Sequence, residues 1–130
     1  METNQQETIP YEKLMPTRVL RCKSEVGPIM DAIYVLGGKW RIPITIALME
    51  GNIRFSEIQR AVDKITSKVL AHELKEMELN GFVEKKIHGD NPIKIEYELT
   101  DYSWSIKPIL ISLRDFGIIH RDKLRKENRD

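Results

Sequence analysis

One predicted helix carries, on a single face, the side chains best suited to bind a polyanion. The stretch TSKVLAHELKEMELNG has Thr66 or Ser67 available as N-cap, apolar Leu70, Leu74 and Met77 at helical spacing, and Gly81 as a stop. Its outward face is small, polar or cationic, whereas its glutamates mostly lie elsewhere or further along. That face consists of Ser67, Lys68, Ala71, His72 and Lys75.

These residue types suit a phosphate backbone and the edges of bases. Lys68 and Lys75 can bind phosphate or guanine, and Ser67 and His72 can form hydrogen bonds with base edges or phosphates. Ala71 allows close approach or touches a thymine methyl group. Taken alone, the same face is equally typical of an ordinary solvated helix, so the surrounding elements must decide.

Two helices are predicted near the start of the ordered part. In GPIMDAIYVLGG, Pro28 suits the first helical position and Gly37 the left-handed residue that stops a helix, which predicts a helix over 28–36. In WRIPITIALMEG, the alternation of isoleucines also fits a strand, but the composition favours a helix over 40–50.

A third, short helix is predicted in RFSEIQRAV, where Ser56 and Gln59 stand at capping-box spacing. A break at 63–65 separates it from the helix that begins near Thr66. Two short helices joined by a tight turn are the core of a helix-turn-helix motif.

Residues 82–99 change to a period of two. Ile95, Tyr97 and Leu99 alternate with Glu96 and Glu98, which predicts a half-buried antiparallel hairpin with a polar tip at HGDNPIK. The cations expected on this hairpin are Lys85, Lys86 and Lys94.

The chain returns to helical spacing from Thr100 onward. Pro108 is expected to kink this helix, and residues 120–130 are charged and expected to fray. Its apolar stripe could be core alone, but a domain this small gains most by burying such a helix across a twofold interface, which we favour. The stripe comprises Ile106, Ile109, Leu110, Leu113 and Phe116.

The order of helices and hairpin predicts a mainly α fold with a small β-hairpin, a winged helix-turn-helix. In that arrangement the second helix of the motif enters the DNA major groove, and the ribbon reaches the neighbouring backbone or the minor groove. Arg54, just ahead of the motif, would then hold a phosphate together with Lys39.

Four stretches resemble, in order and spacing, the HxlR family of bacterial winged helix-turn-helix transcriptional regulators. They are GPIMDAIYVLGGKWRIPI, RFSEIQRAV, ITSKVLAHELKEMELNGFVEKK and IEYELTDY, and the resemblance covers about residues 27–119. It implies homodimers that bind operator DNA, with the N-terminal segment and the long C-terminal helix packing against the other subunit. It also implies that Trp40 anchors the helix after Gly37 and Gly38, with Lys39 outside near the DNA backbone.

One feature of the family pattern is missing. Members commonly carry a cysteine directly before the proline that starts the first helix, and some use it to sense oxidants or electrophiles. Gly27 holds that place here, and Cys22, the only cysteine, lies five residues upstream. A thiol switch therefore does not transfer to it directly, and Cys22 stays only a candidate for sensing. Trp104 is a second candidate, since it could line a small-molecule pocket or lie at the dimer interface.

Size and composition agree with this interpretation. The chain has 130 residues, 41% of them hydrophobic, and a formal net charge of +1, which fits one small domain flanked by an N-terminal arm over 1–26 and a charged tail over 120–130. We expect a cytoplasmic location, because no window suits a membrane span and the start lacks the features of a signal peptide. A lone cysteine and three scattered histidines argue against a metal site, and we expect no cofactor.

We therefore expect a homodimeric, sequence-specific regulator that binds double-stranded DNA, with an unknown small-molecule effector as a further candidate partner. Repression is favoured over activation because no segment is obviously suited to touching polymerase. The rival from another class is a winged-helix protein-interaction module that dimerises but has lost DNA binding. An enzyme is a distant third, because the chain has no Gly-rich phosphate loop, nucleophile elbow or HExxH motif.

Overall fold

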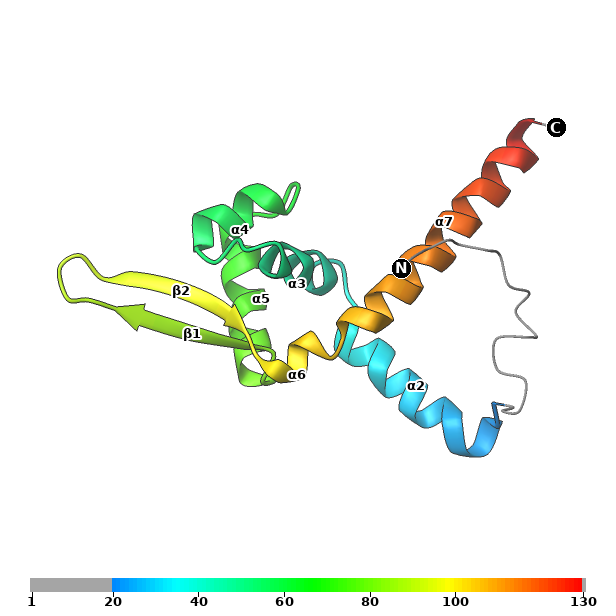
Figure 1. Ribbon diagram of the computed structural model, residues 1–130, viewed down its shortest axis with the longest axis horizontal. Coiled ribbons are helices and arrows are strands. Elements are labelled where there is room, and N and C mark those ends of the chain that lie inside the picture. The colour runs from blue at the N-terminus through cyan, green and yellow to red at the C-terminus, as the bar shows by residue number, and fades with distance from the viewer. Residues whose placement is uncertain (1–19, 130) are drawn as a thin grey trace, which may run out of the picture. The chain divides into compact units, whose positions relative to one another are not determined.

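The computed structural model describes residues 20–129, which divide into two compact units between Gly37 and Gly38 (Figure 1). The first unit contains α2 (Cys22–Leu36). The second contains the helices α3 (Arg41–Met49), α4 (Phe55–Ala61) and α5 (Ser67–Leu79), the strands β1 (Val83–His88) and β2 (Lys94–Leu99), and the helices α6 (Asp101–Trp104) and α7 (Lys107–Arg129). The predicted fold class, helices with one small hairpin, is confirmed. Of the expected arm, residues 1–19 lie outside the described range.

Helix α2 begins six residues before the predicted start, so Pro28 lies inside it and not at its first position. The first turn is closed instead by Glu25, whose Oε2 accepts from the Arg21 N–H at 3.2 Å. Because a proline removes only one helical donor, helix-compatible residues before it can still join the same helix. Residues 22–26 therefore belong to a helix, and not to the arm expected there.

The glycines after α2 also differ from the prediction. Gly37 is extended, with φ −74°, and the left-handed residue is Gly38, with φ +90°. Gly37 is required for another reason, since a Cβ there would lie 2.6 Å from the carbonyl oxygen of Ile33. The two glycines thus have separate roles: Gly37 allows close approach to the Ile33 carbonyl oxygen, and Gly38 adopts a left-handed conformation.

The core of the second unit is built from the inward faces of α3, α4 and α5, from α6 and from the base of the hairpin. The predicted apolar stripe of α5 is confirmed, because all three of its residues are buried. The side chains with less than 2% exposure in this core are Ile44, Ile58, Leu70, Leu74, Met77, Val83 and Ser103.

Helix α4 is capped differently from the prediction. The expected capping box of Ser56 and Gln59 is wrong, since α4 already begins at Phe55. Glu57 Oε1 instead accepts from the backbone N–H groups of Ile53 and Arg54, each at 3.0 Å. These two hydrogen bonds favour the ionised form and lower the pKa of Glu57.

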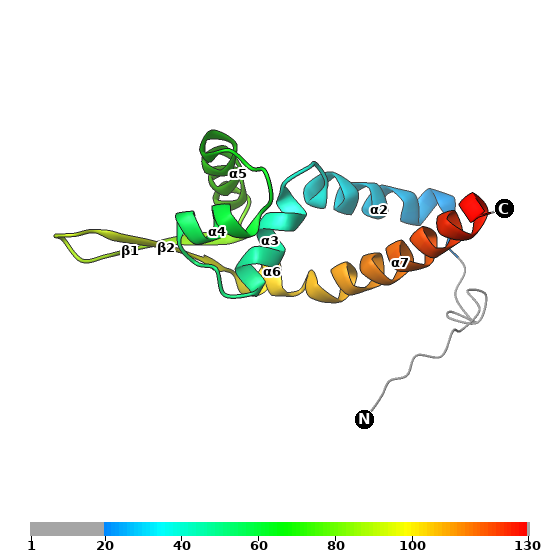
Figure 2. The same ribbon diagram turned by 90° about the horizontal axis from the view of Figure 1, so that it is seen from above.

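The two strands form the predicted antiparallel hairpin, which extends away from α3, α4 and α5 as a flat ribbon (Figure 2). Its register runs from Val83 opposite Leu99 at the base to His88 opposite Lys94 near the tip. At mid-length, the Tyr97 N–H donates to the Ile53 carbonyl oxygen at 2.8 Å, which attaches the segment before α4 to β2. We call this hairpin the wing.

The C-terminal region is two helices, and not one helix kinked at Pro108. Thr100 caps α6, its Oγ1 accepting from the Ser103 N–H at 3.3 Å and donating to the Gly81 carbonyl oxygen at 2.7 Å. The break follows α6, and Pro108 falls in the first turn of α7, where its missing donor costs nothing. Helix α7 then runs to Arg129, so the expected fraying of the charged tail is wrong. Pairs such as Lys123–Glu127, at 2.6 Å, stabilise that last part.

Candidate nucleic-acid interface

The five predicted residues of α5, Ser67, Lys68, Ala71, His72 and Lys75, are all exposed. The opposite face of α5 is fixed by the three buried core residues, so the helix cannot roll without exposing them. The Arg41 guanidinium on α3 lies 3.7 Å from the Glu73 carboxylate on α5, which adds a polar contact between these helices. A rigid helix thus presents one small, cationic face to solvent.

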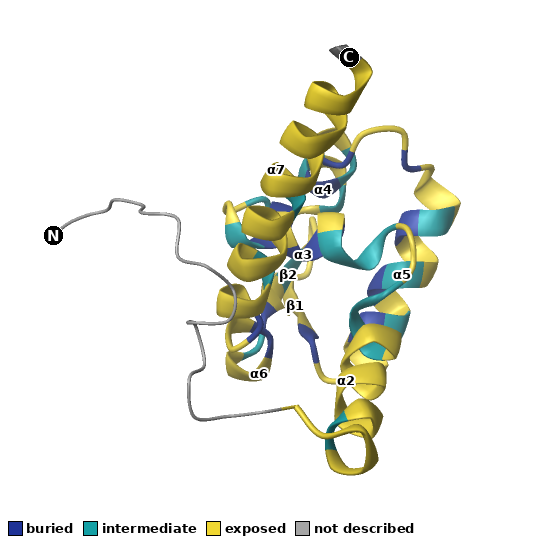
Figure 3. Ribbon diagram, turned by 90° about the vertical axis from the view of Figure 1, so that its right-hand side faces the viewer, coloured by how far each residue is buried: buried dark blue, intermediate teal, exposed yellow. Residues whose placement is uncertain are grey.

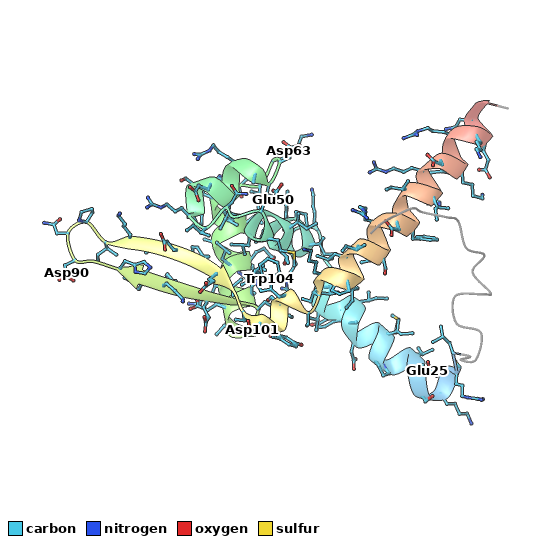
Figure 4. All side chains as sticks on the ribbon, in the orientation of Figure 1. Glu25, Glu50, Asp63, Asp90, Asp101 and Trp104 are labelled. Carbon is cyan, nitrogen blue, oxygen red and sulfur yellow. The ribbon has the colours of Figure 1, made fainter. Side chains whose placement is uncertain are left out.

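Of the two predicted cap candidates, Thr66 and not Ser67 caps α5, its Oγ1 accepting from the Val69 N–H at 3.2 Å. The turn before it contains Lys64 at φ 67°, a left-handed conformation that a lysine adopts only at a cost. Ile65, the last residue of the turn, is buried and anchors it. Figure 4 labels Asp63 at the start of this turn, beyond the end of α4.

Gln59 of α4 bridges this turn, a role that the sequence analysis missed. Its Nε2 donates to the Ile65 carbonyl oxygen at 3.3 Å, and its Oε1 accepts from the Ser67 hydroxyl at 3.1 Å. The side chain expected to cap α4 therefore positions the start of α5. No local pattern gives this contact, because it depends on the angle between the two helices.

Further cations lie on the same motif. Arg54 is exposed at the N-terminus of α4, as expected for a phosphate contact, and Arg60 and Lys64 are exposed at its other end. Neither Arg60 nor Lys64 was identified from sequence, although both fall within the predicted helix and turn. Lys39 Nζ lies 4.9 Å from the centre of the Trp40 ring, a cation–π contact that holds its ammonium beside the start of α3.

The wing does not bring its three lysines to one face. Because side chains alternate along a strand, Lys85 shares a face with Val83 and Tyr97, whereas Lys86 and Lys94 lie on the opposite one. That opposite face also carries acids: Lys86 Nζ lies 2.7 Å from Glu98 Oε1.

Two effects follow from the acids on the wing. The carboxylate of Glu98 raises the pKa of Lys86 and competes with any phosphate for its ammonium group. Nearer the tip, His88 Nε2 lies 3.2 Å from Glu96 Oε1. Among the described residues, Lys85 and Lys94 form no ion pair, so they are the wing cations open to an outside anion.

The residues predicted for dimerisation fall into two groups. Ile106 is buried within the chain, at 8% exposure, and is not open to a partner. Ile109, Leu113 and Phe116 are exposed, the last two at 51% and 58%, and Leu110 is half-buried. Figure 3 shows α7 exposed along almost its whole length.

The two sensing candidates lie in different units of the chain. Trp104 on α6 is 42% exposed, and Cys22 is an exposed free thiol at the first residue of α2, in the other unit. Within the described residues, no group of three or more His, Cys, Asp and Glu side chains is placed to hold a metal ion.

Comparison with known proteins identifies the family. The model of the HxlR-like helix-turn-helix family matches residues 35–125. The chain belongs to the HxlR-like helix-turn-helix family. Membership confirms the resemblance drawn from sequence and makes the chain a DNA-binding regulator of transcription, a kind of protein that is not an enzyme.

The relatives of the chain include two HTH-type transcriptional regulators. The chain is 29% identical over 99 residues to the uncharacterized HTH-type transcriptional regulator YdeP of Bacillus subtilis, with 76% of this chain and 77% of YdeP covered. It is 39% identical over 102 residues to BH0655 of Halalkalibacterium halodurans, a regulator of the same description, with 74% and 90% covered.

Solved HxlR-type and related structures share the fold. The redox regulator HypR in its reduced form has a TM-score of 0.70 at 31% identity, over 76% of this chain and 98% of HypR. The reduced form of the transcriptional regulator YodB from B. subtilis has a TM-score of 0.65 at 30% identity, over 75% and 92%. The winged-helix prediction is therefore confirmed. Within residues 20–129, no single helix is long and apolar enough to cross a membrane, and α2 and α3 reach that length and composition only when counted together.

Proposed function

We propose that this HxlR-like protein is a homodimeric, sequence-specific repressor that binds a near-palindromic operator through α5 and the wing. The observation that carries the proposal is the exposed face of α5, from Ser67 to Lys75, which is small and cationic and is flanked by Arg54 and Lys64. Among the described residues, none of these four basic side chains, Lys68 and Lys75 included, forms an ion pair, so each is open to a phosphate.

In this proposal the residues divide by role. Lys68, Lys75, Lys39 and Arg54 bind phosphates, and Lys85 and Lys94 do so from the wing. His72 and Ser67 read base edges, and Ala71 lets the helix approach. Lys86 contributes least, because Glu98 already occupies its ammonium group.

Dimerisation is proposed from the unpartnered apolar side chains of α7. Ile109, Leu113 and Phe116 expose apolar surface that a second copy would bury. Twofold symmetry would place two α5 helices on half-sites about 34 Å apart, which is one turn of DNA. An effector would act by changing that spacing, with Trp104 and Cys22 as the candidate sensing residues.

The experiment is fluorescence anisotropy of the full chain with duplexes tiled from upstream of its own gene, beside a scrambled duplex, at two salt concentrations. Tight, salt-sensitive binding to one near-palindromic duplex supports the proposal. Weak and equal binding to every duplex, with and without treatment by candidate effectors, would favour a dimeric protein-interaction module instead.

Two variants separate the roles of the wing and α5. Lys85→Ala is expected to weaken binding to all duplexes and flatten the salt dependence, because it removes one phosphate contact. His72→Ala is expected to change the preference between duplexes. If both variants weaken binding to operator and scrambled DNA equally, His72 does not read bases.

A further inference from the structure

The carboxamide of Gln59 joins the last residue of the turn to the first residue of α5. Ile65 offers a carbonyl oxygen, which only accepts, so the group facing it must be the NH₂ of the amide. The amide oxygen of Gln59 then necessarily faces Ser67. The orientation of this amide is therefore set by the chain, and not by a choice between equivalent flips.

This orientation of the amide sets the direction in which the Ser67 O–H bond points. A serine hydroxyl has one proton and two lone pairs, and its proton is directed to Gln59 Oε1 at 3.1 Å. The lone pairs remain, and the Ser67 side chain is exposed at the start of α5. Toward solvent, the hydroxyl therefore accepts hydrogen bonds and does not donate them.

An acceptor discriminates among the groups that DNA presents. Phosphate oxygens, guanine N7 and O6, and thymine O4 are all acceptors and cannot pair with it. The N4 amino group of cytosine and the N6 amino group of adenine are donors. On the basis of the proposed function, we propose that Gln59 is a positioning residue that makes Ser67 a reader of cytosine or adenine amino groups in the major groove.

The test measures how the full chain ranks operator duplexes that carry each of the four bases at every half-site position. The wild-type chain should prefer adenine and cytosine over guanine and thymine at one position by about threefold to tenfold, the worth of one hydrogen bond. Ser67→Ala should abolish that ratio. Gln59→Met, whose thioether sulfur is only a weak acceptor, should also bring it close to one, because the Ser67 proton is then free to donate to DNA.

The double variant distinguishes positioning from a general structural role. With Ser67→Ala already present, Gln59→Met should leave the ratio unchanged. Ser67→Thr is the matched control: it keeps a hydroxyl whose proton Gln59 Oε1 accepts, so the ratio should persist. Thermal unfolding followed by circular dichroism confirms that each variant is folded, and if Gln59→Met is not, Gln59→Ala is measured in its place.

The two possible failures are distinguishable. Suppose that the wild-type chain prefers its operator and that Gln59→Met lowers affinity for all duplexes equally, with the base-preference ratio unchanged. That result would overturn the role of Gln59 alone. Loss of the ratio in folded Ser67→Thr would do the same. Absence of any operator preference in the wild-type chain would overturn the proposed function, and this inference with it.

Discussion

Lys85 and Lys86 are neighbours in the chain, but only Lys85 is open to an anion, because Glu98 lies 2.7 Å from the Lys86 ammonium. Lys85→Ala should therefore reduce the slope of log affinity against log salt by about 0.9, the value for one phosphate contact. Lys86→Ala should reduce it less. Glu98→Gln should steepen it, because it releases Lys86. Anisotropy titrations over a range of salt measure all three, and equal slopes for the two lysine variants would contradict the masking of Lys86.

Glu57 gives a second prediction at the scale of one residue. Its pKa is lowered in the folded chain by the N–H groups of Arg54 and Ile53, so its ionised form stabilises the fold. That contribution is complete above its ordinary value of 4.5 and is lost as pH falls through the lower folded value. Between pH 6 and pH 3, the melting temperature of the wild-type chain should therefore fall further than that of Glu57→Gln. Parallel melting curves for the two proteins across that range would disprove this.

At the scale of elements, the turn between α4 and α5 contains strain that can be removed. Lys64 has φ 67°, a left-handed conformation that costs a non-glycine residue roughly 1–2 kcal/mol and that glycine adopts freely. Glycine costs about 0.4–1 kcal/mol through the flexibility of the unfolded chain. Lys64→Gly should therefore stabilise the fold by about 0.5 kcal/mol in urea denaturation, whereas Lys64→Ala, which keeps the strain, should not. A loss of stability in Lys64→Gly would show that the lysine side chain itself holds the turn.

Element types could be predicted from sequence, whereas several element ends could not. Apolar spacing identified α4, α5 and the wing, because burial imposes that spacing directly, whereas composition decided that α3 is a helix. The start of α4 was missed since Glu57 and Ser56 are both acceptable capping residues, and only the path of the backbone decides between them. The start of α2 was missed because Pro28 is compatible with either an end or an interior.

In the candidate site, too, local spacing predicts some features and not others. The exposed face of α5 follows from its buried stripe, and so Ser67, Lys68, Ala71, His72 and Lys75 could be predicted. The bridge by Gln59 depends on the angle between two helices, and the pairing of Lys86 with Glu98 depends on strand register. Neither is present in local spacing.

At the scale of the whole molecule, the proposal of a dimer rests on apolar residues that the chain leaves exposed. If α7 pairs across a twofold axis, the melting temperature should rise with protein concentration, because association is linked to folding. Leu113→Asp should produce monomers in sedimentation velocity, since it would place a charge in the interface. Ile87→Asp is the matched control: it makes the same change at an exposed position on the wing and should leave the mass unchanged. If dimers persist in Leu113→Asp, the dimer interface does not include Leu113 and lies elsewhere.

The pairing of acid and base on the wing also bears on how such a protein would find its operator. A genome offers about 10⁶–10⁹ competing sites, and every unpaired lysine raises affinity for all of them alike. The contact of Lys86 with Glu98 withholds one positive charge from that background. A wing with fewer free cations leaves more of the discrimination to α5. Glu98 would thus shorten the time the regulator spends on the wrong DNA, although it touches no base itself.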